Sequence, residues 1–571
     1  MKLLQKILFI SCFIFLFSIT LINSSDMNQD LGRHIKIGEI IVKTFQIPQT
    51  NLFSYTNPDF PFINHHWLSE VIFYLLSQIN LNSLLYLKVI LVLSAFFILI
   101  KHSVNRSGIF PTIISILLFS PFFLDRSQIR PEIFGYLFFS FLLFLLLTYP
   151  KNKKYLFPIP LIMILWVNIH ISFVFGLFII GLLILKSLIL YKKNFLKEKY
   201  FLLIVALSIF SVFLNPNGIS GALYPFTIFS NYGYTIAENQ NLLYLNGMTS
   251  NLWIKYFFIL SPLVFISSII LLSRTKIIEL IILIVFYLTT FIQIRHMPFF
   301  VLAVIPVFAL SLKYIFEEIL KKLSKDNKSI LYLSLSGIFI FYTLFFVSGW
   351  FPKTFDINRN FGSVMTEDAK KGVEFLNKNK LEKNIFNNFD IGGYLIYSLY
   401  PQYKFFVDNR PEAYPADFLK NTYMNIHTDK NLRDKMFEKY NIKTIFFAHS
   451  DQTGWAESFI AEIYKDLNWK LIYADSSIII LSRKTQLPDI RNSNQYFRKV
   501  IGGENNYIKL FSLIKLYNLF EKFDLSQETF DKIARINPAS CSVKKILVKT
   551  YQNPLYLYQS QELKNKYWYC F

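Results

Sequence analysis

QKILFISCFIFLFSITLINSSDMNQDLGRH, residues 5–34, passes from an apolar run at 5–22 directly into a polar segment. An apolar run of this length behind Lys2 and Lys6 is typical of a membrane anchor or of a signal peptide. The run ends in Leu21-Ile22-Asn23-Ser24-Ser25, which has no small-x-small cleavage site and therefore favours the anchor. In both cases the polar segment that follows is expected on the outer face of a membrane.

The rest of the chain repeats this apolar character. Hydrophobic residues make up 53% of the 571 residues and charged residues only 17%, a balance that soluble domains rarely show. With residues 5–22, the apolar runs predict a polytopic α-helical membrane protein of about eleven transmembrane helices. The other ten predicted spans are 82–101, 109–124, 132–149, 155–169, 172–191, 200–214, 254–273, 277–294, 297–313 and 329–350.

The loop charges predict the orientation of these spans. The formal net charge is +22, and up to residue 350 the predicted inner segments carry nineteen Lys and Arg residues against six in the outer segments. Because inner loops of membrane proteins are enriched in Lys and Arg, this bias predicts that the N-terminus lies on the cytoplasmic side of the membrane. It also accounts for the basic charge without nucleic acid, which we exclude as a partner.

Composition divides the chain into three regions. Residues 1–350 form the predicted transmembrane domain, with a long first outer loop at 23–80. Residues 351–485 alternate helix-like stretches (372–376) with strand-like ones (404–408, 444–447 and 477–481), which predicts an extracytoplasmic α/β domain. Residues 486–571 predict a helical tail, in which Cys541 and Cys570 are candidates for a disulfide.

The first outer loop has helical periodicity. Between residues 26 and 45 the apolar positions are spaced by three and four, so one stripe of an amphipathic helix would lie in the membrane interface. Asp26, Asp30 and His34 follow each other at four-residue steps, which predicts that they share one flank of that helix. A second short helix is predicted over 67–79.

Polar residues gather at the predicted outer ends of the spans. Ionisable groups near a membrane are costly unless they face a cavity or a partner, so their clustering on one side predicts a site. A carboxylate there could act as a general base, arginines could hold a phosphate, and histidines could bind phosphate or move protons. The candidate bases are Asp30 and Asp26; the candidate substrate- and phosphate-binding residues are His34, His65, His66, Glu70, Arg126, Arg130, Asn168, His170, Arg295 and His296.

No cofactor follows from these residues with certainty. His65 and His66 are adjacent, so on a helix or strand their rings would point apart and chelate zinc poorly. The sequence leaves open a divalent cation, Mg²⁺ or Mn²⁺, bound by carboxylates. The sequence shows no phosphate-binding glycine loop, no nucleophile elbow and no Cys-x-x-Cys pair.

Several motifs resemble one superfamily. The sequence resembles the GT-C membrane glycosyltransferases, and within them a bacterial group related to the protein mannosyltransferase type. The matching motifs are Asp30-Leu31-Gly32-Arg33-His34, Gly38, Ile47-Pro48, Phe53-Ser54-Tyr55, His66-Trp67-Leu68-Ser69-Glu70, Trp166, Asn168, His170, Asn215-Pro216, Gly218, Gly392-Gly393-Tyr394-Leu395, Asp408 and Arg410.

The resemblance implies a polyprenyl-phosphate-linked sugar donor, membrane lipids around the spans, an acceptor of unknown type, and transfer with inversion. It makes the first-loop acid the catalytic base, with Asp30 the best match and Asp26 the second. The two acids are four residues apart, whereas the group's pattern has them adjacent or separated by one residue. The alternatives are a transporter or flippase of a lipid-linked saccharide and a non-catalytic envelope-assembly protein; ionisable residues at one face rather than at the midplane argue against transport.

Overall fold

The computed structural model describes residues 2–126, 128–151, 153–228, 232–248, 251–355, 360–451 and 453–550. The chain divides into two compact units. The helical unit comprises Met1–Ile22, Ile37–Ile47 and Ile63–Leu344, and the α/β unit comprises Asn23–Lys36, Pro48–Phe62 and Phe345–Phe571. Two pieces of the predicted first outer loop therefore belong to the same unit as the C-terminal third of the chain.

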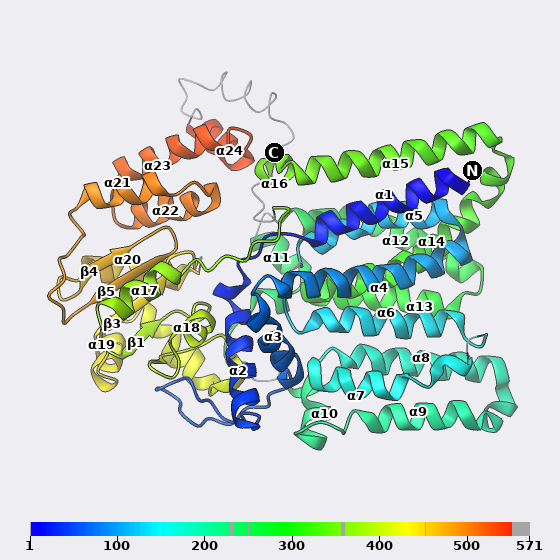
Figure 1. The fold of residues 1–571 in the computed structure, drawn as a ribbon, viewed down its shortest axis with the longest axis horizontal. Helices are drawn as coiled ribbons and strands as arrows, with labels where there is room; N and C mark the ends of the chain where they lie inside the picture. The colour runs from blue at the N-terminus through cyan, green and yellow to red at the C-terminus, as the bar shows by residue number, and fades with distance from the viewer. Residues whose placement is uncertain are drawn as a thin grey trace. The chain divides into compact units, whose positions relative to one another are not determined.

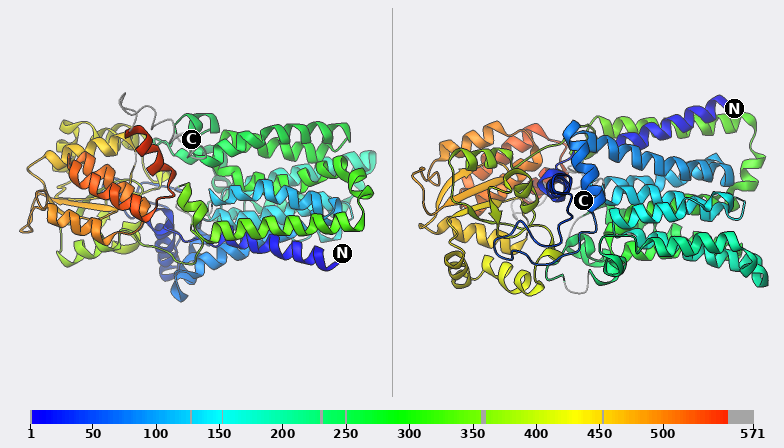
Figure 2. Two further views of the ribbon diagram at one scale, coloured as in Figure 1. Left: turned by 90° about the horizontal axis from the view of Figure 1, so that it is seen from above. Right: turned by 60° about the horizontal axis from the view of Figure 1, so that its bottom comes forward.

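The helical unit is a bundle of long apolar helices (Figures 1 and 2). Every one of the eleven predicted spans coincides with a helix, because each apolar run is long enough to form one and is ended by a polar or proline-containing turn. These helices are α1 (Lys2–Thr20), α4 (Ser83–Ser107), α5 (Ile109–Phe119), α6 (Glu132–Thr148), α7 (Ile159–Ile169), α8 (Phe173–Tyr191), α9 (Lys199–Ser211), α12 (Leu252–Ser273), α13 (Ile277–Ile292), α14 (Met297–Lys322) and α15 (Lys325–Val347).

Six segments are long and apolar enough to cross a membrane, by length and composition: Lys2–Thr20, Ser83–Ser107, Phe173–Lys197, Leu252–Ser273, Ile294–Glu317 and Lys325–Val347. Large apolar side chains face outward from them; Phe265 on α12 is 68% exposed and Phe341 on α15 is 60% exposed. Such outward apolar faces suit a hydrocarbon environment. The chain is a multispan membrane protein.

Helix α14 lies at the centre of the bundle. It packs against α4, α5, α12 and α13, and its residues 299–305 are all buried. A helix that is apolar on every side has to be surrounded by other helices or by lipid. The remaining helices of this unit are short: α3 (Trp67–Ile79), α10 (Gly218–Thr227) and α11 (Leu242–Met248), joined by the single-turn elements η2 (Ser120–Leu124), η3 (Lys153–Leu156), η4 (Lys192–Lys197), η5 (Ala237–Asn239) and η6 (Ile294–His296).

The α/β unit contains a mixed five-stranded sheet in the order β2-β1-β3-β5-β4 (Figure 1). The strands are β1 (Asn384–Asn387), β2 (Lys404–Phe405), β3 (Thr444–Ala448), β4 (Lys470–Ala474) and β5 (Ile478–Ser482). β1 pairs in parallel with β2 and β3, whereas β3 and β4 pair antiparallel with β5. β3 and β5 are buried throughout, as their apolar, β-branched and aromatic residues require.

Helices surround this sheet and complete the unit. Around the strands are α16 (Trp350–Thr354), α17 (Lys370–Lys378), α18 (Gly392–Leu399), α19 (Lys430–Lys439) and α20 (Gly454–Lys465), with the short elements η7 (Pro411–Ala413), η8 (Phe418–Tyr423) and η9 (Asn425–His427). The C-terminal helices are α21 (Asn494–Gly503), α22 (Tyr507–Leu519), α23 (Phe523–Ile536) and α24 (Cys541–Thr550). The predicted α/β region and helical tail are thus both present; the predicted Cys541–Cys570 disulfide involves a residue outside those described.

Segments of the first outer loop are hydrogen-bonded into the α/β unit. Ser24 forms a parallel bridge with Met365, and Ser54 forms one with Phe405 of the edge strand β2. The amide of Phe405 donates to the carbonyl of Phe53 at 3.0 Å. The loop acids are therefore carried by the α/β unit.

The helix predicted over 26–45 is interrupted. It consists of a single turn, η1 (Asp26–Asn28), and then α2 (Asp30–Thr44), because Gln29 between them has φ −123° and ψ −125°, which is not helical. The prediction that Asp26, Asp30 and His34 share one flank of a continuous helix was therefore wrong for Asp26. The helix predicted over 67–79 is present as α3.

Candidate functional site

The predicted site residues fall into two groups. Asp26, Asp30 and His34 belong to the α/β unit, and the remaining nine belong to the helical unit.

Asp30 opens α2 and is held by two donors. The Nδ2 of Asn409 donates to its Oδ1 at 2.8 Å, and the guanidinium of Arg33, one turn along α2, lies 3.2 Å from the same oxygen. A carboxylate in the first turn of a helix is also favoured by the helix dipole. The side chain of Asp30 is 24% exposed, whereas Asp26 in η1 is 6% exposed. Of the two candidate bases, Asp30 is the more accessible.

A buried ion pair flanks Asn409 in the sequence. Arg410 donates from Nε and Nη2 to the two carboxylate oxygens of Asp408 at 2.7 and 2.8 Å, and from Nη2 to Oδ1 of Asn51 at 3.0 Å. The hydroxyl of Tyr414 donates to Oδ2 of Asp408 at 2.8 Å. Since Asp408 and Arg410 are each only 1% exposed, this network fixes the backbone on both sides of Asn409.

Two glycines allow the backbone around Asp30 to pack tightly. A Cβ on Gly393, near the start of α18, would lie 2.0 Å from the carbonyl oxygen of Gln29, the residue before Asp30. A Cβ on Gly392 would lie 2.6 Å from Cα of Asp408. The two glycines begin α18, and their missing side chains let this helix approach the backbones of Gln29 and Asp408.

Arg33 interacts with Asp30, with His34 and with a second acid, Glu412. Its Nη2 lies 3.5 Å from Nε2 of His34, which is 2% exposed. Burial raises the pKa of Glu412 above its ordinary value, and Arg33 opposes that shift. The Nε of Arg33 and the amide oxygen of Asn409 are buried without a hydrogen-bond partner. Buried polar atoms without a partner are rare in native structures, so these two atoms mark the surroundings of Asp30 as a candidate site.

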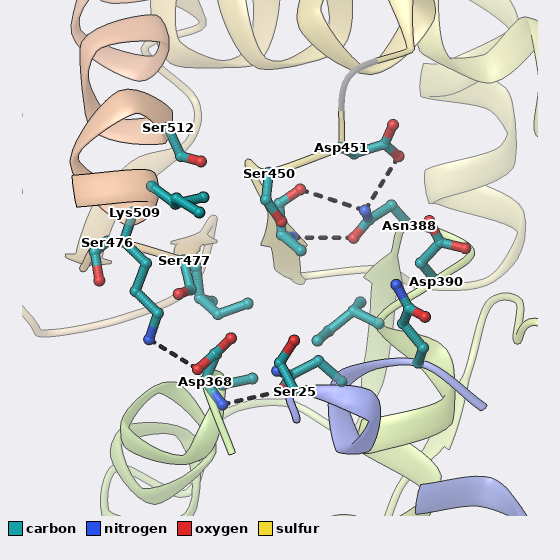
Figure 3. A pocket seen from close by; sticks show the side chains of 17 residues that line it. Ser25, Asp368, Asn388, Asp390, Ser450, Asp451, Ser476, Ser477, Lys509 and Ser512 are labelled. Carbon is teal, nitrogen blue, oxygen red and sulfur yellow. Dashed lines mark hydrogen bonds and ion pairs between the residues drawn. The ribbon is translucent and has the colours of Figure 1, made fainter. Parts of the chain in front are cut away.

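A polar cavity of about 250 Å³ lies in the α/β unit next to the first-loop turn (Figure 3). Asn28 and Gln29 contribute to its wall. Asp368 and Lys509, which also line it, form an ion pair at 2.8 Å (Figure 3). At roughly 30 Å³ per molecule it has the volume of about eight waters. Its other polar lining residues are Ser25, Asn388, Asp390, Ser450, Asp451, Ser476, Ser477 and Ser512. Hydroxyl, amide and carboxylate groups together suit a ligand rich in hydroxyls.

In the helical unit, two predicted arginines share one glutamate. Arg126 donates to Oε2 of Glu238 at 2.8 Å and Arg130 donates to the same oxygen at 2.5 Å. Burial acts to raise the pKa of Glu238, but Arg126 and Arg130 outweigh it, so the pKa lies well below its ordinary value. Arg295 bonds to Oδ1 of Asn239 at 2.9 Å. Three arginines thus gather around η5, the segment Ala237–Asn239.

The histidines form a second cluster in the same unit. The rings of His66 and His170 stack with their centroids 5.3 Å apart, and those of His65 and His66 lie 3.8 Å apart. The prediction that His65 and His66 point apart was wrong, because they lie in a bend before α3 rather than on a helix or strand. The Nδ1 of His170 pairs with the hydroxyl of Ser172 at 2.7 Å.

Three other predicted residues have partners within the fold. Glu70 is 1% exposed and accepts from Asn64 at 2.7 Å. Asn168 uses both amide donors on the carbonyls of Ile164 and Leu214, and it accepts from the indole of Trp67. His296 pairs with the carbonyl of Thr289 at 3.1 Å. These contacts indicate roles in holding helices and loops in place.

No group of three or more His, Cys, Asp or Glu side chains among the described residues is arranged to hold a metal ion. The predicted pair Asp26 and Asp30 is divided between η1 and α2. The described side chains therefore offer no preformed cluster for the divalent cation, and no step of the reaction proposed for this chain passes through one.

Sequence reasoning missed Glu238 and Asn409. Glu238 lies in a long segment between two predicted spans, and only its being the single acid of residues 215–253 could have drawn attention to it. Asn409 stands between Asp408 and Arg410, which form a buried ion pair.

Comparison with known proteins relates the chain through structure alone. No protein-family model and no curated protein sequence matches it. The crystal structure of the Archaeoglobus fulgidus oligosaccharyltransferase in complex with Zn and sulfate matches with a TM-score of 0.53 at 10% identity, covering 96% of this chain and 86% of that one. ArnT from Cupriavidus metallidurans bound to undecaprenyl phosphate matches with a TM-score of 0.49 at 10% identity, over 85% of this chain and 98% of that one. At 10% identity the first of these likenesses concerns the fold alone: the chain has a fold similar to that of the oligosaccharyltransferase structure.

Proposed function

We propose that this protein is an inverting glycosyltransferase that uses a polyprenyl-phosphate-linked sugar at the outer face of the membrane. The observation that carries the proposal is the arrangement at Asp30: an accessible carboxylate in the first outer loop, held at one oxygen by Asn409 and Arg33. The fold, shared with an oligosaccharyltransferase, supports a transferase of this class.

In the proposed reaction Asp30 is the general base. Its carboxylate takes the proton from an acceptor hydroxyl as that oxygen bonds to the anomeric carbon of the donor sugar. The bond from that carbon to the phosphate oxygen breaks, and the lipid phosphate leaves with the electron pair. Because the displacement is direct, the configuration at the anomeric carbon inverts. Asn409 and Arg33 hold the carboxylate of Asp30 through Oδ1 and so fix its orientation toward the acceptor.

Arg126, Arg130 and Arg295 are the proposed phosphate ligands. Guanidinium groups bind phosphate oxygens in pairs, and three of them gather here around Glu238, with Glu132 3.8 Å from Arg126 as a second acid. In the absence of a phosphate, Glu238 orients Arg126 and Arg130. His65, His66 and His170 are proposed to contact the donor from the same unit.

The polar cavity of the α/β unit is the proposed site of the acceptor. Its lining of hydroxyls, amides and carboxylates favours a hydroxyl-rich molecule, and Asn28 and Gln29 connect its wall directly to Asp30 in the chain. We propose the orientation that the loop charges predict, with the N-terminus cytoplasmic and the α/β unit extracytoplasmic.

The proposal is tested with the purified full-length protein in proteoliposomes. A panel of polyprenyl-phosphate sugars is added, and consumption of each donor and release of polyprenyl phosphate are followed by mass spectrometry. We expect one donor to be consumed, faster when an acceptor is present. A donor that is bound but returned intact would contradict the transferase and favour the transporter or assembly alternatives.

A further inference from the structure

The helical unit contains a second cavity, at the ends of its helices remote from the histidine cluster. It has a volume of about 840 Å³ and is lined by α4, α6, α8 and the turn after α6. Its α4 residues lie between Phe97 and Arg106, in the second half of a helix that begins at Ser83, just after α3. At 1.5 Å per residue the two ends of α4 are about 35 Å apart, roughly the thickness of a membrane.

The charge on the wall of this cavity is strongly positive. Lys101, Arg106, Lys151 and Lys186 line it, and the lining residues, all within the described chain, include no Asp or Glu. Glu279 on α13 does not line the cavity, but it forms an ion pair with Arg106, one of the four basic residues that do. Lys186 is half-buried and donates to the carbonyl of Leu146 at the end of α6, at 2.7 Å. More positive charge lines the cavity than this one acid can neutralise.

His102 gives an independent indication of a ligand. It lines the cavity, is only 8% exposed, and its Nε2 is buried without a hydrogen-bond partner. A buried polar atom without a partner is costly, and one that lines a cavity is ready to bond to a molecule within it. The general enrichment of Lys and Arg at cytoplasmic helix ends explains the basic residues, but it explains neither the cavity nor the buried histidine nitrogen without a partner.

The other walls of the cavity are apolar. Phe97, Phe141 and Phe144 line it, and the ammonium of Lys101 lies 5.8 Å from the centre of the Phe97 ring. Phe97 is 44% exposed, so an aromatic surface continues from the cationic centre outward along the helices. A ligand that satisfies both walls carries a phosphate at one end and a hydrocarbon chain at the other.

We propose that this cavity binds the phosphate head group of an anionic phospholipid, with an acyl chain lying along the phenylalanines. Basic pockets between transmembrane helices are known to bind phosphorylated lipid head groups on the cytoplasmic side. In the orientation proposed above, the lipid comes from the inner leaflet. This site is separate from the proposed donor site, and its occupancy does not depend on transferase activity.

Native mass spectrometry of the full-length protein in detergent tests the proposal. The protein is titrated with dioleoyl phosphatidylglycerol, with dioleoyl phosphatidylcholine of the same acyl chains, and with inorganic phosphate. We expect saturable binding of one phosphatidylglycerol, at least tenfold tighter than phosphatidylcholine, that equimolar inorganic phosphate does not displace. Equal binding of the two lipids would overturn the proposal, and displacement by inorganic phosphate would reassign the cavity to a soluble anion.

Paired variants locate the site. Lys101 and Lys151 are exposed on the rim, so the double variant Lys101→Gln/Lys151→Gln is expected to fold and to lose about thirtyfold in phosphatidylglycerol affinity. The control Lys192→Gln/Lys193→Gln removes the same charge from two exposed lysines that do not line the cavity. It is expected to change the affinity less than threefold. Equal losses in the two variants would show that the lipid responds to overall charge and not to the cavity.

Discussion

Replacing Arg410 with methionine tests the network that holds Asn409 beside Asp30. The substitution keeps most of the side-chain volume but removes both guanidinium bonds to Asp408, which is 1% exposed and retains only the Tyr414 hydroxyl. Breaking a buried ion pair from one side costs about 3–5 kcal/mol, since the remaining charge is left uncompensated. Arg410 also stacks on Phe53 and Phe62 at 4.8 and 4.9 Å, contacts that are lost as well.

The loss is measured by differential scanning calorimetry of the full-length protein in detergent. For a domain of the size of the α/β unit, about 2–4 °C of Tm is expected per kcal/mol, so Arg410→Met should lower the Tm of that unit by about 10 °C. The double variant Asp408→Asn/Arg410→Met leaves no buried charge and should recover about half of the loss. A decrease of less than about 2 °C in the single variant would refute the description of Asp408 as a buried carboxylate that depends on Arg410.

Three further outcomes follow from the structure. Gly393→Ala places a methyl 2.0 Å from a backbone oxygen and should cost about 1–3 kcal/mol of unfolding free energy and much of the activity, whereas Gly454→Ala, with nothing within 4 Å, should change neither; similar values for the two would refute the close approach. Burial lowers the pKa of His427 to about 4, so the contribution of His427 to the stability of the α/β unit should be fully present above pH 6.5 and fall by about 3 kcal/mol as pH falls from 6.5 to 4; unfolding curves of His427→Phe should lack this part of the pH dependence and keep the part due to His449, whose pKa burial also lowers. Glu238→Gln leaves Arg126 buried with a weakened partner and should lower the Tm of the helical unit by several degrees, whereas Glu317→Gln, which breaks an exposed pair with Lys321, should leave it within one degree.

Local patterns in the sequence predicted the helices well but the sheet only in part, since β1 and β4 match none of the strand-like stretches and 404–408 is a strand only at Lys404–Phe405. The eleven apolar runs, the helix over 67–79 and the strand-like stretches at 404–408, 444–447 and 477–481 each contain their own signal, in length or in residue type. The break at Gln29 was missed because Asp26, Asp30 and His34 continue a helical spacing through it. What ends η1 there is a backbone conformation, which leaves no mark on the spacing of side chains.

Partners distant in the sequence could not be predicted in the same way. Asn409 reaches Asp30 across 379 residues, and no periodic pattern connects two such positions. The assignment of Asn23–Lys36 to the α/β unit has the same origin, because it rests on backbone pairing such as that of Ser24 with Met365. The arginines were predicted from their charge, but their shared partner Glu238 was not, since a single acid in a long loop carries no signal by itself.

The most direct test of the proposed function is the rate of sugar transfer by Asp30→Asn. The wild type, Asp30→Asn and the control Asp524→Asn, an exposed acid on α23, are compared in proteoliposomes with the donor that the wild type consumes. Because amide replacement removes the base but can keep the hydrogen bond from Arg33, we expect Asp30→Asn to bind donor normally and to lose at least 10²-fold in transfer rate, with the control unchanged. Transfer by Asp30→Asn at the wild-type rate would contradict the assignment of Asp30 as the catalytic base.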